Sequence, residues 1–225
     1  MDYEEFEHDT EEKIKRWWDE NGKSLIAAVV VGVGAVFGWD QYQKNDQAQA
    51  EAVSAQFQNL MEEQLSLPDN ASEEDRSKVF EIANTLTEEH ANTSYAVYSD
   101  LIMAKLAVDT KDYALAETHL KQANTSAKTP ELKDLTNLRL AQVLFAQEKD
   151  DDALALLPES AEGSYASRML ELRADILLAK GDKTAARSVY EKAIAQAGMT
   201  GMPIDTLELK RNDLNDVVTS AETVN

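Results

Sequence analysis

An uncharged apolar run near the N-terminus is the feature that most constrains this chain. Residues 24–39 read SLIAAVVVGVGAVFGW, in a sequence of 225 residues that is otherwise rich in charge. A helix rises about 1.5 Å per residue, so a run of this length covers about 24 Å, which is most of the hydrocarbon core of a bilayer. With three further residues at the far end, the sequence predicts a transmembrane helix over residues 24–42.

Aromatic and basic side chains flank this run in the pattern typical of a membrane helix. The expected interface anchors are Trp17, Trp18, Lys23, Trp39 and Tyr42. Four basic residues precede the run, at positions 13, 15, 16 and 23, whereas Lys44 alone lies in the twenty residues after it. Since basic residues stay on the cytoplasmic side, the sequence predicts a short acidic cytoplasmic tail over residues 1–23 and a body on the other side of the membrane.

Two other interpretations of the run remain open. A buried helix of a soluble protein can be this apolar, but it would have to be apolar on every face at the edge of a very polar chain. A cleaved signal peptide would explain the sequence Ala48-Gln49-Ala50, which has the form of a cleavage site. The long acidic leader and the nine-residue distance from Trp39 to that site favour an uncleaved anchor.

Small residues recur within the run at the spacing of one helix face. The pair Gly34 and Gly38 forms a GxxxG motif, and Ala28 and Gly32 extend the same face. Small side chains allow a second membrane helix to approach closely. We therefore expect this face to take part in helix packing in the membrane, with another copy of the chain or with a different membrane protein.

Composition excludes several classes of function. The formal net charge of −20 disfavours binding to nucleic acid. The chain has no cysteine, so it has no disulfide and no thiolate metal site. The three histidines, His8, His90 and His119, lack metal-ligand spacing and are expected on the surface. We find no motif of a nucleotide-binding loop or a hydrolase, so the sequence predicts no enzyme activity, no catalytic residue, no metal and no cofactor.

The remainder of the chain has the composition of an all-helical domain, with few glycine and proline residues. Apolar periodicity predicts two helices in a stalk or cap over residues 43–93, followed by three helical pairs over residues 94–200. Residues 201–225 are expected to form a capping segment with a frayed end from residue 214. The expected helices cover residues 46–65, 72–89, 94–108, 112–123, 131–147, 151–157, 164–180 and 183–197.

The three helical pairs share a pattern of small and large residues. Aligning Ala104, Ala141 and Ala174 shows that small residues recur 12 and 19 positions later and that a large residue recurs 16 positions later. The one-letter sequence ARSVYEKA at 186–193 shows the pattern best, whereas Pro158 interrupts the second pair. The units are 37 and 33 residues apart, close to the 34 residues of a tetratricopeptide repeat. The fold class is therefore all-α, a transmembrane helix followed by a tetratricopeptide-like solenoid of helical hairpins; a plain helical bundle is the alternative.

The segments IKRWWDENGKSLIAAVVVGVGAVFGW and LRADILLAKGDKTAARSVYEKA make the chain resemble the ancillary SecYEG translocon subunit family. The resemblance covers nearly the whole chain and implies a single-pass protein of the bacterial inner membrane with a periplasmic C-terminal domain. It further implies association with the SecYEG translocon and with a PpiD-like periplasmic chaperone, and a role in passing emerging polypeptides to periplasmic chaperones. A link between the cytoplasmic tail and a response regulator is a further implication of the family.

Stacked helical hairpins form a concave face built mainly by the first helix of each pair. The positions that line this face in such repeats correspond here to Tyr98, Lys105, Gln142, Phe145, Arg168, Glu171 and Asp175. Exposed aromatic residues with charges of both signs suit the binding of proteins or peptides. Taken singly, aromatic residues at such positions more often belong to the core, and charged residues more often belong to a solvated face.

The function predicted from these features is that of a membrane-anchored scaffold that acts through protein contacts. The alternative is an envelope stress signalling component whose cytoplasmic tail binds and restrains a response regulator. A cleaved, soluble binding protein is a third interpretation.

Overall fold

The computed structural model describes the backbone of residues 3–68 and 70–222, and the side chains of residues 13–24, 26–68 and 70–214. Regular secondary structure in these ranges is helical throughout, as predicted. The chain divides into two compact units, Met1–Ala52 and Val53–Asn225, which we describe separately.

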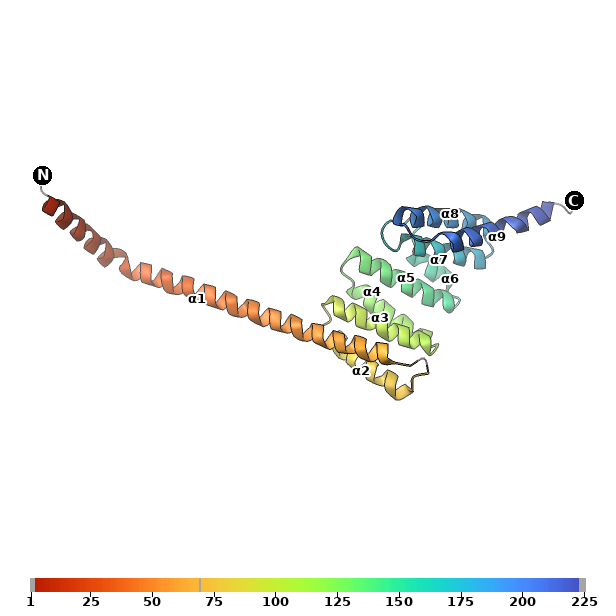
Figure 1. Ribbon diagram of the computed structural model, residues 1–225, viewed down its shortest axis with the longest axis horizontal. Coiled ribbons are helices and arrows are strands. Elements are labelled where there is room, and N and C mark those ends of the chain that lie inside the picture. Colours follow the sequence, from red (N-terminus) through yellow and green to blue (C-terminus); the bar gives the residue numbers. More distant parts are fainter. Residues whose placement is uncertain (1–2, 69, 223–225) are drawn as a thin grey trace. The chain divides into compact units, whose positions relative to one another are not determined.

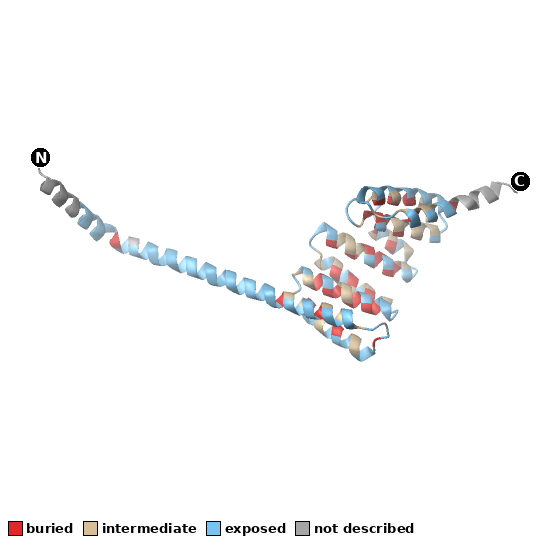
Figure 2. Cartoon of the chain, in the orientation of Figure 1, coloured by how far each residue is buried: buried red, intermediate tan, exposed pale blue. Residues whose placement is uncertain are grey.

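The first unit consists of the N-terminal part of helix α1, which runs from Tyr3 to Ser66. The sequence predicts separate helices over residues 24–42 and 46–65, whereas the helix continues between them. Residues 40–50 contain neither glycine nor proline, and Lys44 pairs with Asp40 one turn earlier at 2.7 Å, so nothing interrupts the backbone there. In Figure 2 almost every described residue of this unit is exposed.

A bend in α1 lies at the start of the apolar run. Among the described residues, no single helix is both long and apolar enough to cross a membrane, but the segments Lys13–Ser24 and Ile26–Ser66, which meet at an angle of 43°, satisfy these requirements of length and composition together. The apolar residues beyond the bend, 26–39, are followed at once by Asp40, Gln41 and Gln43. The transmembrane helix expected over residues 24–42 therefore stays a prediction.

The second unit is a series of antiparallel helical hairpins (Figure 1). The expected helix boundaries within this unit agree with the observed ones within three residues. After α1 the chain forms α2 (Glu73–Glu89), α3 (Ser94–Asp109), α4 (Tyr113–Ser126), α5 (Pro130–Ala146), α6 (Asp150–Leu156), α7 (Ala166–Ala179), α8 (Lys183–Thr200) and α9 (Asp205–Glu222).

Side-chain caps explain where several of these helices begin. Ser72 and Asp75 form a capping box at the start of α2. Asp112 and Asp182 accept hydrogen bonds from the backbone N–H groups three residues later, at 3.0 and 2.9 Å, and so start the second helices of the first and third repeats. The equivalent residue of the second repeat is Lys149, and its side chain makes no such bond.

The turn inside each repeat has the same backbone conformation. Lys111, Glu148 and Gly181 have φ angles of 62°, 60° and 87°. In each turn the next residue donates its N–H to a carbonyl five residues earlier, as in the common left-handed termination of a helix. These positions are separated by the same 37 and 33 residues as the alanines used to align the repeats, so the backbone repeats in step with the sequence.

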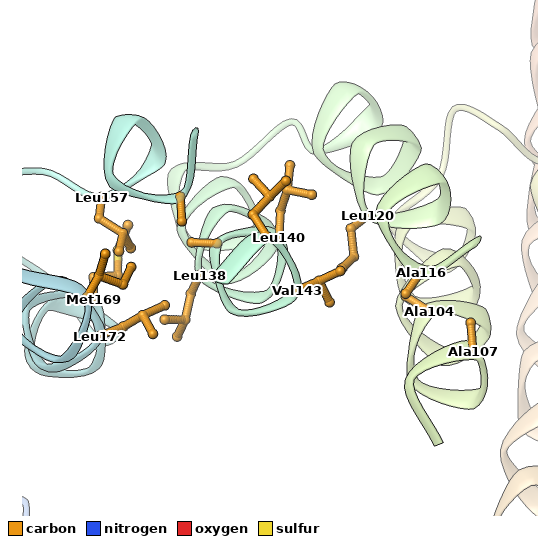
Figure 3. Packing of buried hydrophobic residues seen from close by; sticks show 14 residues of the cluster. Ala104, Ala107, Ala116, Leu120, Leu138, Leu140, Val143, Leu157, Met169 and Leu172 are labelled. Atoms are coloured by element: carbon orange, nitrogen blue, oxygen red, sulfur yellow. The ribbon is translucent and has the colours of Figure 1, made fainter. Parts of the chain in front are cut away.

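Burial confirms the predicted repeat pattern. The small and large positions of all three repeats are buried, with Ser160 as the one exposed member. In Figure 3, Leu140 and Val143 of α5 lie toward Leu120 of the first repeat, whereas Leu138 lies toward Met169 and Leu172 of the third. Alanines where the helices cross allow close approach, and the larger side chains fill the remaining space. The aligned buried positions are Ala104, Ala116, Leu120, Ala123, Ala141, Ala153, Leu157, Ala174, Ala186, Tyr190 and Ala193.

The end of α1 and helix α2 pack onto the first repeat. Leu60 of α1 and Val79 of α2 are fully buried in one cluster with Met103 of α3. The apolar core therefore continues from residues 53–66 into the repeats. The stalk or cap expected over residues 43–93 stays a prediction.

At the C-terminus, the structure contains a helix that is not predicted from the sequence. Helix α8 ends at Gly201, and α9 starts at Asp205 and buries Leu207 and Leu214 against α7 and α8. The expected frayed end begins at Leu214, but the backbone is helical to Glu222. The side chains of residues 215–225 and the backbone of residues 223–225 lie outside the described parts.

Candidate functional site

A groove runs along the first helices of the repeats, and its first part is apolar. We call this part the apolar lobe; its volume is about 550 Å³. Helices α3 and α5 form its two sides, and Tyr113 and Leu120 of α4 contribute to its lining. The complete lining is Leu101, Ala104, Lys105, Val108, Tyr113, Leu120, Leu135, Arg139, Gln142, Val143 and Ala146.

The second part of the groove is polar and lies between α5 and α7. This polar lobe has a volume of about 560 Å³, and Met202, just before α9, reaches its edge. Arg139 and Gln142 line both lobes, so the two lobes adjoin at α5. The complete lining is Leu138, Arg139, Gln142, Ser164, Tyr165, Arg168, Glu171, Leu172, Asp175 and Met202.

Five of the seven residues proposed for the concave face line this groove. Lys105 belongs to the apolar lobe and Gln142 to both lobes. The other three, Arg168, Glu171 and Asp175, belong to the polar lobe. The structure therefore brings these five residues together, and their role in binding stays a prediction.

Tyr98 and Phe145 line neither lobe. Phe145 is half-buried and packs against the core cluster of α3 to α7. Tyr98 is 40% exposed, and its ring centroid lies 6.1 Å from that of Phe57 in α1. Both aromatic side chains thus contact other parts of the helical array.

Sequence reasoning missed Arg139 and Tyr113 as lining residues. Arg139 lies three residues before Gln142 in α5, so both share one helix face, and this spacing could have revealed it. Tyr113 belongs to a second helix of a pair, which the rule for the concave face does not include. The start of α4 lies near the end of α5, since the carbonyl of Tyr113 accepts a hydrogen bond from the side chain of Gln147.

Ion pairs neutralise the acidic side chains of the polar lobe. Lys210 of α9 lies 2.9 Å from both Glu171 and Asp175, and Arg168 lies 3.1 Å from Glu171. Partial burial alone would lower the pKa of Lys210, but the hydrogen bonds to the two carboxylates outweigh it and raise the pKa. Burial, together with a hydrogen bond to Asp175, raises the pKa of Tyr190.

Positive charge predominates in the apolar lobe. Its charged lining residues are Lys105 and Arg139. Lys105 pairs with Asp109 one turn away at 2.8 Å. Arg139 donates to the amide oxygen of Gln142 at 3.0 Å and, within the described part of the chain, has no carboxylate partner.

Glu117 links the first and second repeats. Its carboxylate accepts hydrogen bonds from Lys121, Lys149 and Gln147 at 2.6, 2.8 and 3.0 Å. The bond from Lys121, followed by that from Lys149, lowers the pKa of Glu117 to about 2. This charged cluster ties α4 to the turn between α5 and α6.

The expectation that all three histidines lie on the surface is wrong for His119. Its side chain is 14% exposed, and its Nδ1 lies 3.1 Å from a carboxylate oxygen of the buried Asp100. Phe80 of α2 contacts the ring at a centroid distance of 6.0 Å. Burial raises the pKa of Asp100, although the bond to His119 opposes this effect. A single histidine on a helix gave no signal for this pairing.

His90 is 26% exposed in its side chain, and His8 lies outside the described side chains. Among the side chains that the structure describes, no group of three or more histidine or acidic residues is arranged to hold a metal ion.

The residues proposed for membrane packing and anchoring lie in the first unit. Trp17, Trp18, Trp39 and Tyr42 are exposed, and the rings of Trp39 and Tyr42 lie 6.1 Å apart. The apolar run is exposed on all sides, with Val31 and Phe37 both 71% exposed. Soluble monomers rarely present such a surface to water. The packing face is formed by Ala28, Gly32, Gly34 and Gly38, all exposed, and Lys23 is exposed as well.

Comparison with known proteins identifies the family. A family profile described as "Tetratricopeptide repeat-like domain" matches residues 15–216. A protein of Escherichia coli named "Ancillary SecYEG translocon subunit" is 31% identical over 215 residues, which cover 96% of this chain and 100% of that protein. The chain belongs to the ancillary SecYEG translocon subunit family.

Two further members of this family are similar over most of their length. The protein of Aggregatibacter actinomycetemcomitans is 36% identical and that of Haemophilus influenzae 34% identical, with 82% and 80% of this chain covered and 87% and 85% of theirs. Both carry the name "Ancillary SecYEG translocon subunit". No solved structure matches the chain.

Proposed function

We propose that this chain is a non-catalytic scaffold that associates with the SecYEG translocon at the inner membrane and helps transfer emerging polypeptides to periplasmic chaperones. Its groove is the site that contacts the polypeptide. The observation that carries this proposal is the groove formed by two adjoining lobes along α3, α5 and α7, in a chain whose relatives are named translocon subunits.

The groove has the features of a surface that binds a protein chain. Each lobe is large enough for side chains of a partner, and an apolar wall adjoins a polar one. Repeat solenoids use concave surfaces of this kind for binding, because each repeat adds one helix to the same face.

The membrane anchor is the second part of the proposal. The exposed apolar run of α1 becomes buried when it lies in a bilayer, and the basic residues before it favour a cytoplasmic position for the tail of residues 1–23. In this topology the repeats lie in the periplasm, where they meet polypeptides that leave the translocon and a PpiD-like chaperone.

Site-specific photocrosslinking in intact cells tests this proposal. One probe replaces Gln142 in the groove and another replaces Gly34 in the membrane run. A third probe at Arg187, an exposed residue of α8 outside both lobes, is the matched control. Mass spectrometry then identifies the crosslinked proteins.

We expect adducts of the Gln142 probe with exported polypeptides or a periplasmic chaperone, and adducts of the Gly34 probe with translocon subunits. The Arg187 probe should give few of either. If the two test probes yield no such adducts although they are incorporated and photoactive, the scaffold role is wrong. Adducts of a tail probe with a response regulator would then favour the signalling role.

A further inference from the structure

The charges of the apolar lobe differ in sign from those of the chain as a whole. The sequence contains 42 acidic and 22 basic residues, so acids outnumber bases by nearly two to one. The charged residues that line this lobe are nevertheless both basic, Lys105 and Arg139. Lys105 already pairs with Asp109, so Arg139 supplies the positive charge that remains for a ligand. Such a charge in an acidic protein favours an anionic ligand at that place.

Arg139 is the cation best placed to meet such a ligand. It is exposed and lies where the two lobes join. Its guanidinium donates to the neutral amide of Gln142, and no carboxylate of the described residues lies within ion-pair distance. A guanidinium group presents several donors in a fixed plane that matches a carboxylate.

The polar lobe does not favour a basic ligand, although acidic residues line it. Its acids, Glu171 and Asp175, are already held by Lys210, and Glu171 also pairs with Arg168. A basic ligand would have to displace these contacts, whereas an acidic ligand meets Arg139 without breaking an ion pair. The groove therefore discriminates against positive charge beside the apolar lobe.

We propose that the apolar lobe binds an extended polypeptide segment in which a large apolar residue is adjacent to an acidic one. The apolar side chain lies between Leu101, Val108 and Leu135, and the acidic side chain pairs with Arg139. This inference names the ligand class of the groove and rests on the proposed function, in which that groove contacts polypeptides.

The size of the site fits this ligand. A lobe of about 550 Å³ holds a side chain of leucine or phenylalanine together with part of the backbone. Neighbouring residues of an extended chain are about 3.3 Å apart along its axis, so an acidic residue next to the apolar one stays within reach of the junction between the lobes.

Peptide binding to the full chain in nanodiscs of zwitterionic lipid tests the inference. Three fluorescent ten-residue peptides share one neutral, polar sequence and differ at its centre, which reads Leu-Glu, Leu-Lys or Ser-Glu. Acetylated and amidated ends make the glutamate the one carboxylate of each acidic peptide. Fluorescence anisotropy measures each Kd at two salt concentrations.

We expect the Leu-Glu peptide to bind about tenfold more tightly than either other peptide, with a preference over Leu-Lys that declines at high salt. Arg139→Glu should reverse the preference, so that Leu-Lys binds more tightly than Leu-Glu. Arg187→Glu changes the same charge outside the groove and should leave all three Kd values within about twofold. Equal unfolding midpoints of the two variants exclude a general loss of structure.

Equal binding of Leu-Glu and Leu-Lys would overturn this inference and leave the proposed polypeptide-binding role of the groove in place. If the Arg139→Glu variant still bound Leu-Glu more tightly than Leu-Lys, the inference would be overturned as well, because a residue other than Arg139 would then bind the glutamate. Failure of all three peptides to bind would overturn it too, and the crosslinks of the Gln142 probe show independently whether the groove contacts polypeptides in cells.

Discussion

Glu117 shows how one carboxylate can hold two repeats together. It is 14% exposed in its side chain and accepts hydrogen bonds from α4 itself and from the turn after α5. Its partners Lys121 and Lys149 are 63% and 42% exposed, so solvent screens part of the attraction. The cluster therefore stabilises the fold by less than the displacement of the pKa alone implies.

Glu117→Gln should lower the free energy of unfolding by about 1–2 kcal/mol at pH 7. The pKa of Glu117 is about 2 in the folded state, compared with an ordinary value of 4.5. Since the folded pKa is the lower one, the contribution is complete above about pH 4.5 and is lost as the pH falls toward 2. Urea unfolding followed by circular dichroism at several pH values measures the difference between the proteins.

Glu191→Gln is the matched control, because Glu191 is 53% exposed and its ion-pair partner among the described residues is Arg187, at 3.5 Å. Its effect should stay below about 0.5 kcal/mol. A difference for Glu117→Gln that persists unchanged at pH 2 would show that packing, and not charge, is responsible.

Substitutions of the turn residues Glu148 and Gly181 should change the free energy of unfolding in opposite directions. Both have positive φ angles, which a residue with a Cβ adopts at a cost. Glu148→Gly should raise the free energy of unfolding by about 0.5–1 kcal/mol, and Gly181→Ala should lower it by about 1 kcal/mol. A Cβ at Gly181 would meet no atom within 4 Å, so the second effect is purely conformational. The same urea titration measures both changes in the free energy of unfolding. Changes in the same direction would contradict the argument from backbone strain.

At the level of helices, the alanines at crossing positions set how closely the pairs pack. Ala193 is fully buried in α8, whereas Ala195 of the same helix is exposed. Ala193→Leu should lower the free energy of unfolding by about 1–3 kcal/mol, because the added atoms force α7 and α8 apart. Ala195→Leu adds the same atoms on the exposed face and should change it by less than about 0.5 kcal/mol. Similar losses in both variants would show that helix propensity dominates.

Helix α9 is held to the third repeat by Lys210 as well as by buried leucines. Lys210→Ala leaves Glu171 and Asp175 without their shared cation and should lower the free energy of unfolding by about 1–2 kcal/mol. In this variant, amide hydrogen exchange in α9 should be faster than in the unmodified protein, whereas exchange in α3 should stay the same. Among the described side chains, the neighbouring Arg211 bonds to Asn212 and to no carboxylate, so Arg211→Ala is the control and should leave exchange in α9 unchanged. Unaltered exchange after Lys210→Ala would mean that the apolar contacts suffice.

The repeats could be predicted from the sequence, because the residue pattern that identifies them lies within short segments of the chain. Alanine spacing and turn residues identify α3 to α8, and the same positions are the buried ones in the structure. Helix α9 was missed because its burial rests on Leu207 and Leu214, which have no partner in the repeat pattern. The pairs of Lys210 with Asp175 and of His119 with Asp100 join residues 35 and 19 positions apart, and such contacts depend on how the helices pack.

For the whole molecule, the absence of cysteine permits a direct test of topology. A single cysteine at Glu20 should react with a membrane-impermeant maleimide only after the inner membrane is opened, whereas one at Glu89 should react in intact spheroplasts. The reason is the predicted cytoplasmic tail and periplasmic body. The unmodified chain is the control and should not react. Reaction of Glu20→Cys in intact spheroplasts would contradict the proposed orientation, because residue 20 would then lie outside the cytoplasm.

The short helix α6 makes the middle repeat depend on the repeat that follows it. It has seven residues, no side-chain cap at its start, and Pro158 soon after its end. Arg173 of α7 donates hydrogen bonds to the carbonyls of Leu154 and Leu157, where a longer helix would bond to itself. The middle repeat is thus completed by a side chain of the third. A chain truncated before α7 would lose α6 as well, and the repeats of this protein are not interchangeable building blocks.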